Sequence, residues 1–228
     1  MRVSIHQPTF LPWSGLFHKI LSADVHVFYS SAQFNKRGYQ NRVFYNDSWL
    51  TIPVCMKGIQ DSENHVIPIM DIKFSNFRYN MEKIIRRIET SEKKKPFFSR
   101  LDKILDFLHK SLLCDEETLK LTDVTIPLTK IICRIVSHSN NVRFLELKEV
   151  LENGSPASKI DKILSKTWAN TYLSGKGAME YLEREKLKVP ILYQEQVKEV
   201  DAGSIISILT SESSPYDYIM SRFRWVVK

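Results

Sequence analysis

The first residues able to carry chemistry are a histidine and a glutamine at the end of an apolar run. Residues 3–5 form that run, His6 and Gln7 follow it, and two prolines stiffen the next segment. A histidine titrates near neutral pH, so His6 is our candidate for a general base and Gln7 for a group that orients a polar substrate. The alternative is that His6 only hydrogen-bonds to the proline-rich loop and shapes it.

The elements around this pair predict where it lies. Ser14 is a plausible N-cap for a helix whose apolar residues recur at helical spacing over residues 16–21, and Asp24 ends that helix. Residues 25–29 then form a second strand. In open parallel sheets, ligands bind at the carboxyl ends of strands, where helix N-termini also point. We therefore expect His6 and Gln7 at a ligand site.

A second unit of the same kind occurs late in the chain. Residues 171–174 and 188–193 are strand-like and flank a glycine loop and a short helix over residues 178–185. Glycines that open a helix let backbone N–H groups approach a phosphate or carboxylate. The loop lacks the spacing of a P-loop. The unit supplies four predicted substrate-binding residues: Ser174, Gly175, Lys176 and Tyr193.

A basic, amide-rich segment follows the second strand and should share its rim. Lys36 and Arg42 suit phosphates, Asn41 suits polar substrate groups, and Trp13 suits stacking on a base or sugar. The competing interpretations are solvated surface charges for the cations and a loop anchor in the core for the tryptophan.

Two such strand–loop–helix–strand units favour an α/β fold, a Rossmann-like and mostly parallel sheet. Between these two units, apolar residues recur at helical spacing over residues 78–138. We expect this region to form an inserted or appended helical subdomain. Pro96 should separate its first two helices, and a helix pair over residues 119–121 and 126–136 should follow, with Pro127 near a helix start. The predicted parts, within one compact unit, are residues 1–77, 78–138 and 139–228.

Composition narrows the partners. The net charge of +7 favours phosphate-bearing ligands, whereas no zinc-finger, helix-turn-helix or RNP-like pattern supports DNA or RNA. Basic runs such as residues 93–95 are compatible with weak association with a membrane surface. No apolar run approaches the roughly 20 residues of a membrane span, and the start lacks a secretory pattern. We expect a cytoplasmic protein whose oligomeric state is open.

The three cysteines and the histidines indicate no metal. Cys55, Cys114 and Cys133 are widely spaced and odd in number, which predicts reduced, mostly buried thiols. The six histidines lack metal-ligand spacing. The predicted site therefore contains no metal.

The order and spacing of several motifs resemble the WbqC-like protein family. The matching elements are His6-Gln-Pro8, Phe10-Leu-Pro-Trp13, Gly15, Lys19, Asp24, Gln33-Phe34, Lys36, Asn41-Arg42, Trp49-Leu-Thr-Ile-Pro-Val54 and Tyr172-Leu-Ser-Gly175. The resemblance implies a role in bacterial O-antigen or lipopolysaccharide synthesis. It implies a transferase that forms an amide on a nucleotide-linked amino sugar, by acyl or aminoacyl (for example glycyl) transfer from ATP plus acid or from another activated acyl donor.

Two departures from the family leave alternatives open. Ser30-Ser31 stands where many relatives have an aspartate, and residues 204–209 lack the family's acidic residue. The architecture also resembles nucleotidylyltransferases and pantothenate synthetases, which bind ATP phosphates with a His-x-Gly-His motif. In this chain Gly15-Leu16 stands where the Gly-His of that motif would be required. A non-catalytic nucleotide-sugar-binding protein and an ATP-using nucleotidyltransferase or amide ligase therefore remain as alternatives.

Overall fold

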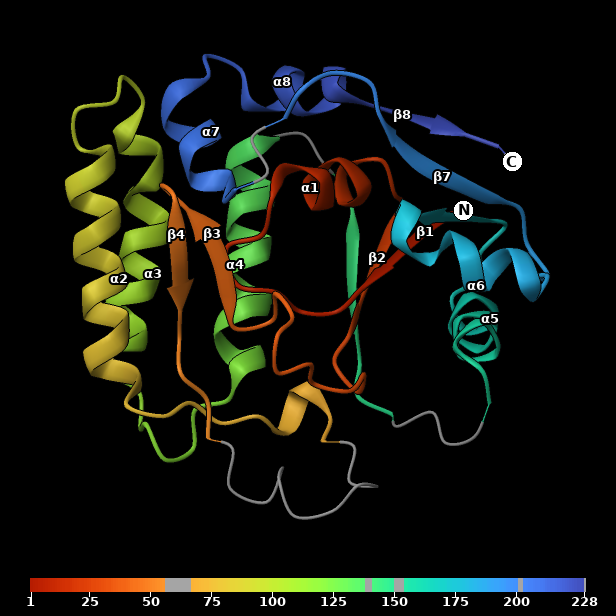
Figure 1. The fold of residues 1–228 in the computed structure, drawn as a ribbon, viewed down its shortest axis with the longest axis horizontal. Coiled ribbons are helices and arrows are strands. Elements are labelled where there is room, and N and C mark those ends of the chain that lie inside the picture. Colours follow the sequence, from red (N-terminus) through yellow and green to blue (C-terminus); the bar gives the residue numbers. More distant parts are fainter. Residues whose placement is uncertain (56–66, 138–140, 150–153, 201–202, 228) are drawn as a thin grey trace.

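A six-stranded sheet forms the centre of the molecule. The computed structural model describes residues 1–55, 67–137, 141–149, 154–200 and 203–227, without the side chains of residues 181, 183 and 184. The strand order is β5-β2-β1-β6-β7-β8 (Figure 1). Five strands are parallel, and β8 runs antiparallel to β7, so the predicted mostly parallel α/β sheet is confirmed. The strands are β1 (Arg2–His6), β2 (Val25–Tyr29), β5 (Arg143–Leu147), β6 (Thr171–Ser174), β7 (Ile191–Gln196) and β8 (Phe223–Val226).

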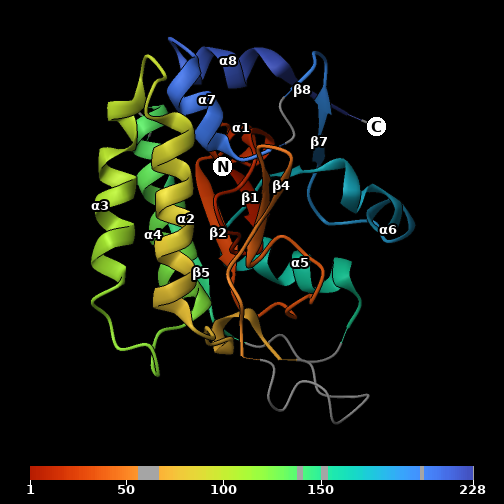
Figure 2. The same cartoon turned by 60° about the vertical axis from the view of Figure 1, so that its left-hand side comes forward.

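Alternation along the central strands assigns their two faces. Val3 pairs with Val25 and Ile5 with Val27, and all four side chains join one apolar cluster with the helix α5. The intervening residues, including Ser4 and His6, therefore face the opposite layer. Figures 1 and 2 show α5 (Pro156–Lys166) and α6 (Met179–Arg184) on one side of the sheet and the remaining helices on the other.

The second layer is larger and shares one hydrophobic cluster. The predicted helical region supplies three of its helices, and these pack together with the N-terminal helix, the hairpin and the C-terminal helices. In the described residues, no helix combines the length and the apolar character needed to cross a membrane. The layer comprises α1 (Ser14–Leu21), α2 (Phe77–Glu92), α3 (Asp102–Ser111), α4 (Leu121–Val136), α7 (Ile205–Ser211), α8 (Pro215–Arg222) and the hairpin β3 (Arg42–Tyr45) with β4 (Ser48–Thr51). Three short 3-10 turns complete the fold: Ile69–Asp71, Phe98–Leu101 and Lys176–Ala178.

The predicted helix pair over residues 119–136 is wrong, because α4 is one helix with Pro127 in its interior. An interior proline costs roughly 3 kcal/mol. Burial of an aliphatic side chain contributes about 1.5–3 kcal/mol, and Leu121, Val124, Leu128 and Ile132 are all fully buried. Packing of this face therefore outweighs the proline, and the helix continues through it.

Two smaller predictions also need correction. Helix α1 begins at Ser14 with Trp13 as its N-cap, so the cap lies one residue earlier than expected. Two thiols, Cys55 and Cys114, are exposed, and only Cys133 is buried. Cys55 follows β4 in the chain and Cys114 follows α3, and both side chains lie at the surface.

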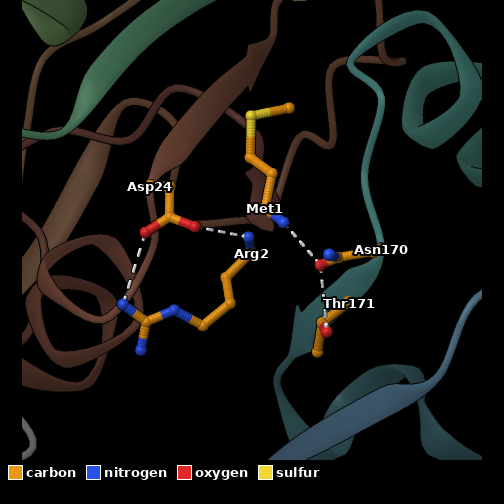
Figure 3. Close-up of polar contacts among 5 residues, drawn as sticks. All are labelled: Met1, Arg2, Asp24, Asn170 and Thr171. Carbon is orange, nitrogen blue, oxygen red and sulfur yellow. Dashed lines mark hydrogen bonds and ion pairs between the residues drawn. The ribbon is translucent and has the colours of Figure 1, made fainter.

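Asp24 lies at the amino ends of the strands, on the edge opposite His6. Its carboxylate accepts hydrogen bonds from the backbone N–H of Arg2 at 2.7 Å and from the Arg2 guanidinium at 3.3 Å (Figure 3). The Met1 ammonium, just before β1, donates a hydrogen bond to the Asn170 side chain, just before the neighbouring strand β6 (Figure 3). The Arg2 backbone donor, with the Arg2 side chain, lowers the pKa of Asp24 below its usual value. Asp24 therefore fastens the start of β1 to β2.

We expect Asp24→Asn to reduce the free energy of unfolding by less than about 1 kcal/mol, because the pair is half-exposed. A lowered carboxyl pKa stabilises the fold above the unfolded-state value near 3.8, and this stabilisation is lost as the pH falls through the folded-state value. The difference between variant and wild type should therefore shrink below pH 4. Urea unfolding at pH 7 and pH 3 measures it; an equal difference at both values would contradict this account.

Candidate functional site

The sheet has a topological switch point between β1 and β6. The connection from β1 to β2 passes through α1 on one face, whereas the connections into and out of β6 pass through α5 and α6 on the other face. Ligands of open α/β sheets bind in the crevice outside the carboxyl ends of the strands at such a point. His6 ends β1 and Ser174 ends β6. The fold thus brings the two predicted loops together.

A cavity of about 500 Å³ opens at this switch point. We call it the cationic cavity, because its titratable cations are His6, Lys19 and Lys159 and no Asp or Glu is among its described lining residues. Gln7, Ser174 and Gly175 also line it, so four predicted site residues lie in one cavity. Its volume is within the range of roughly 300–1,000 Å³ that is usual for small-molecule sites.

Lys19 is the least expected residue of the cationic cavity. It projects from α1, is only 6% exposed, and donates a hydrogen bond from Nζ to the Ile5 carbonyl at 3.0 Å. Burial lowers the pKa of its ammonium to about 7. About half of the Lys19 side chains are therefore neutral amines at neutral pH. Such a group can give or take a proton at physiological pH.

His6 lies next to this lysine and is neutral. Burial, and then the charge of Lys19, lowers the pKa of His6 to about 3, although its hydrogen bond to the Gln7 carbonyl acts in the opposite direction. The Nδ1 atom lies 2.8 Å from that carbonyl oxygen, so Nδ1 carries the proton of the neutral ring. The other nitrogen, Nε2, is left as an acceptor. His6 is thus suited to accept a hydrogen bond and is a weak base.

A second buried histidine, His26, lies beneath α1. His26 Nδ1 lies 2.7 Å from the Ser4 hydroxyl, and its Nε2 has no partner among the described groups. Burial, followed by the charges of Lys19 and His6, lowers the pKa of His26 well below its usual value. The charge of Lys19 thus disfavours protonation of both histidines, and both rings are neutral at pH 7. Lys19 is therefore the group of these three whose charged form a bound anion would stabilise.

The glycine loop leaves space in the cavity. A Cβ atom added to Gly175 or Gly177 would meet no atom within 4 Å, and neither glycine has a positive φ. Neither the packing nor the backbone conformation of the free protein therefore requires glycine at these two positions. Their missing side chains keep bare backbone at the cavity wall, where a ligand can approach.

Gln7 is oriented by a neighbouring glutamine. The Gln40 amide donates from Nε2 to Gln7 Oε1 at 2.7 Å. This bond occupies the Gln7 acceptor, so the two Gln7 N–H donors remain to point toward a ligand. Gln7 can therefore donate to a carbonyl or an oxyanion.

Two further predicted residues line a second cavity. This aromatic cavity, of about 340 Å³, includes Trp13, Tyr39 and Arg42 and again His6. Trp13 is 37% exposed and its ring covers Gly15, where an added Cβ would lie 2.3 Å from the indole. Arg42 donates to the carbonyls of Gly38 and Arg37.

The remaining predicted residues lie outside both cavities. Lys36 is exposed, and Asn41 is buried, with its amide donating to the Ile52 carbonyl at 2.8 Å. Lys176 pairs with Glu195 at 3.5 Å. Tyr193 is 3% exposed and packs in the cluster beneath the sheet, because its position on β7 faces α5 and α6. These four residues therefore line neither cavity, although Lys176 lies in the turn that follows β6.

Two cavity residues, Lys19 and Lys159, carried no predicted role. Lys19 follows Leu16 by three residues, so its helical position already pointed to the buried face. Lys159 is on the first turn of α5, and no ion pair involves its side chain in the described part of the chain. No group of three or more His, Cys, Asp or Glu residues converges as metal ligands among the residues described.

The fold and this cavity define an α/β protein with a cavity of small-molecule size at the switch point of a parallel sheet. The chain belongs to the WbqC-like protein family, whose model matches residues 7–198. Over 61 residues it is 36% identical to "Uncharacterized protein Rv1507c" of Mycobacterium tuberculosis, which is 25% of this chain and 26% of that protein. The chain thus matches about a quarter of that relative's length. No solved structure gives a significant match.

Proposed function

We propose that this protein is a transferase of bacterial surface polysaccharide (O-antigen) synthesis that forms an amide on a nucleotide-linked amino sugar. The observation that carries the proposal is a ligand-sized cavity at the switch point, where a lysine with a pKa near 7 faces a neutral histidine. Membership of the WbqC-like family supports the polysaccharide context. An amide forms when a neutral amine attacks an activated acyl group, so the site must keep that amine unprotonated.

The positive charges of the cationic cavity favour binding of the substrate's phosphates and the neutral form of its sugar amine. Lys19 and Lys159 attract the phosphates of a nucleotide-sugar. The same positive charges, with no carboxylate in the described lining, lower the pKa of a sugar ammonium and favour the neutral amine. Bound phosphate would raise the pKa of Lys19, whereas burial lowers it. The balance of these two effects sets the fraction of Lys19 that is neutral and able to accept a proton.

The groups at the switch point divide the work of the reaction. The sugar nitrogen attacks the acyl carbonyl, the N–C bond forms, and the bond from the carbonyl carbon to the thiol or other leaving group breaks. Lys19 accepts the proton lost by the nitrogen and passes it to the leaving group as that group departs. His6 Nε2 accepts a hydrogen bond from the attacking amine, and the Gln7 amide donates to the developing oxyanion.

The experiment incubates wild type and His6→Ala with candidate amino-sugar nucleotides and acyl donors, and reads the product by mass. We expect His6→Ala to lower turnover by roughly 10- to 100-fold, since it loses an orienting acceptor rather than the main base. His109→Ala is the matched control, because His109 is a half-exposed histidine on α3, and it should match wild type.

Equal turnover by His6→Ala and wild type would remove His6 from the mechanism. Absence of product with every donor, together with retained nucleotide-sugar binding, would favour a non-catalytic binding protein of the assembly machinery. Release of pyrophosphate from ATP would instead indicate a nucleotidyltransferase or an ATP-dependent ligase.

A further inference from the structure

His6 forms part of the wall of both cavities. In the cationic cavity it lies with Lys19, and in the aromatic cavity it lies with Trp13, Leu16 and Val43. Groups bound in the two cavities would therefore both lie next to His6. Two compartments that meet at one polar side chain are the arrangement expected of a site that brings two reactants together.

The aromatic cavity has the chemistry of an apolar binding site. Aromatic and aliphatic side chains dominate its wall, and Arg42 is the only charged residue of its described lining. The Arg42 guanidinium is already engaged, because Nε donates to Gly38 at 3.2 Å, one NH2 donates to Arg37, and its Cζ lies 4.3 Å from the centre of the Trp49 ring. The occupant of this cavity is therefore held mainly by burial of apolar surface.

An aminoacyl group does not fit this environment. Its ammonium needs an anionic partner, and neither cavity offers a carboxylate among its described lining residues. Arg42 and Lys19 would repel it. A glycyl group would also leave most of the roughly 340 Å³ unfilled. An uncharged acyl chain of several carbons meets neither difficulty.

We propose that the aromatic cavity binds the acyl group of the donor and selects an uncharged, apolar acyl group of several carbons over an aminoacyl group. This inference rests on the proposed amide-forming function and names its donor class. His6 then lies between the acyl carbonyl on one side and the sugar amine in the cationic cavity on the other.

The test measures binding by calorimetry with N-acetylcysteamine thioesters as probes, without any amino sugar. The hexanoyl thioester should bind at least about tenfold more tightly than the glycyl thioester, because it buries several more methylene groups. Val43→Phe, which fills the cavity, should weaken hexanoyl binding about tenfold, and the exposed control Val197→Phe should not. Inorganic pyrophosphate, a probe of the cationic cavity, should bind both variants and wild type alike.

Trp13→Ala provides a second variant that does not depend on overpacking. It widens the cavity, so the preferred thioester should shift from hexanoyl toward octanoyl. Glycyl binding as tight as hexanoyl binding, no effect of either variant, or displacement of the hexanoyl probe by adenosine alone would each overturn the inference. Tight hexanoyl binding without product formation on any amino sugar would count against the proposed reaction only.

Discussion

Lys19→Met is expected to abolish most of the activity while making the protein more stable below pH 7. These opposite effects have one cause. Lys19 is a buried amine whose pKa falls from 10.5 to about 7 because burial disfavours its charged form. Methionine has a similar length and no charge, so it fills the same space without the electrostatic penalty.

The stability change follows from proton linkage. Between pH 7 and pH 10.5 the unfolded chain binds more protons at Lys19 than the folded protein does, so wild-type stability rises with pH over this window and is lowest below pH 7. The penalty below pH 7 is at most roughly 5 kcal/mol, and the unpartnered Ile5 carbonyl in the variant offsets about 1–3 kcal/mol of the gain. We expect a net gain of roughly 2–4 kcal/mol at pH 6.

Urea unfolding from pH 6 to pH 10 measures this difference, which should shrink as the pH rises. The exposed Lys103→Met is the matched control and should show no comparable change. NMR titration adds a second readout: the pKa values of His6 and His26 should rise in Lys19→Met, because the Lys19 charge lowers both. A variant less stable than wild type at pH 6, with unchanged histidines, would refute the buried-charge account.

The activity change follows from the loss of a proton acceptor. In wild type, kcat/KM, which reports the free enzyme, should increase as the pH rises through about 7 and then level off, as neutral Lys19 accumulates. Lys19→Met should lose roughly 100- to 10,000-fold in turnover, the usual contribution of a general base. Lys19→Arg should be similarly inactive, because arginine remains protonated. An unchanged pH profile in either variant would assign the proton transfer elsewhere.

Glu92→Ala should be strongly destabilising, although the residue lies away from the site. Glu92 lies at the end of α2 and is 2% exposed. Tyr45 donates its hydroxyl to one carboxylate oxygen at 2.6 Å, and Thr210 donates to the other. This one side chain therefore connects α2 to β3 and to α7. No ion pair with a basic residue involves Glu92 in the described part of the chain.

Removal of this carboxylate leaves the buried Tyr45 hydroxyl without that acceptor, whereas Thr210 can still donate to the Ile206 carbonyl at 3.2 Å. One unsatisfied buried hydroxyl costs roughly 1–3 kcal/mol, and the cavity left behind adds to this, so Glu92→Ala should lower the free energy of unfolding by about 2–4 kcal/mol. Glu92→Gln keeps one acceptor oxygen and should cost roughly 1–2 kcal/mol. Chemical unfolding at pH 7 measures both changes.

The control is Glu82→Ala on the same helix. Glu82 is half-exposed and lies 3.8 Å from Arg86, and the loss of such a pair should change stability by less than about 0.5 kcal/mol. If Glu92→Ala and Glu82→Ala had equal effects, the three-way connection would not contribute to stability.

The sequence alone determined most of the local elements and the position of the first loop. Strands β2 and β6 lie at their predicted positions, and Pro96 separates α2 from α3 as expected. These features depend on short-range signals, namely hydrophobic period, turn residues and proline geometry. The exit of β1 at His6 was predictable for the same reason.

The tertiary structure decided which residues meet. Ser174 reaches His6 because β6 pairs with β1, a neighbour relation that no local period specifies. Tyr193 is buried because β7 turns that side chain toward α5 and α6, and α4 continues through Pro127 because its face is buried by neighbouring helices. The near-neutral pKa of Lys19 exists only once α1 is packed on the sheet, since burial is a property of the assembled layers. The composition of the cavity, and therefore its chemistry, follows from that packing.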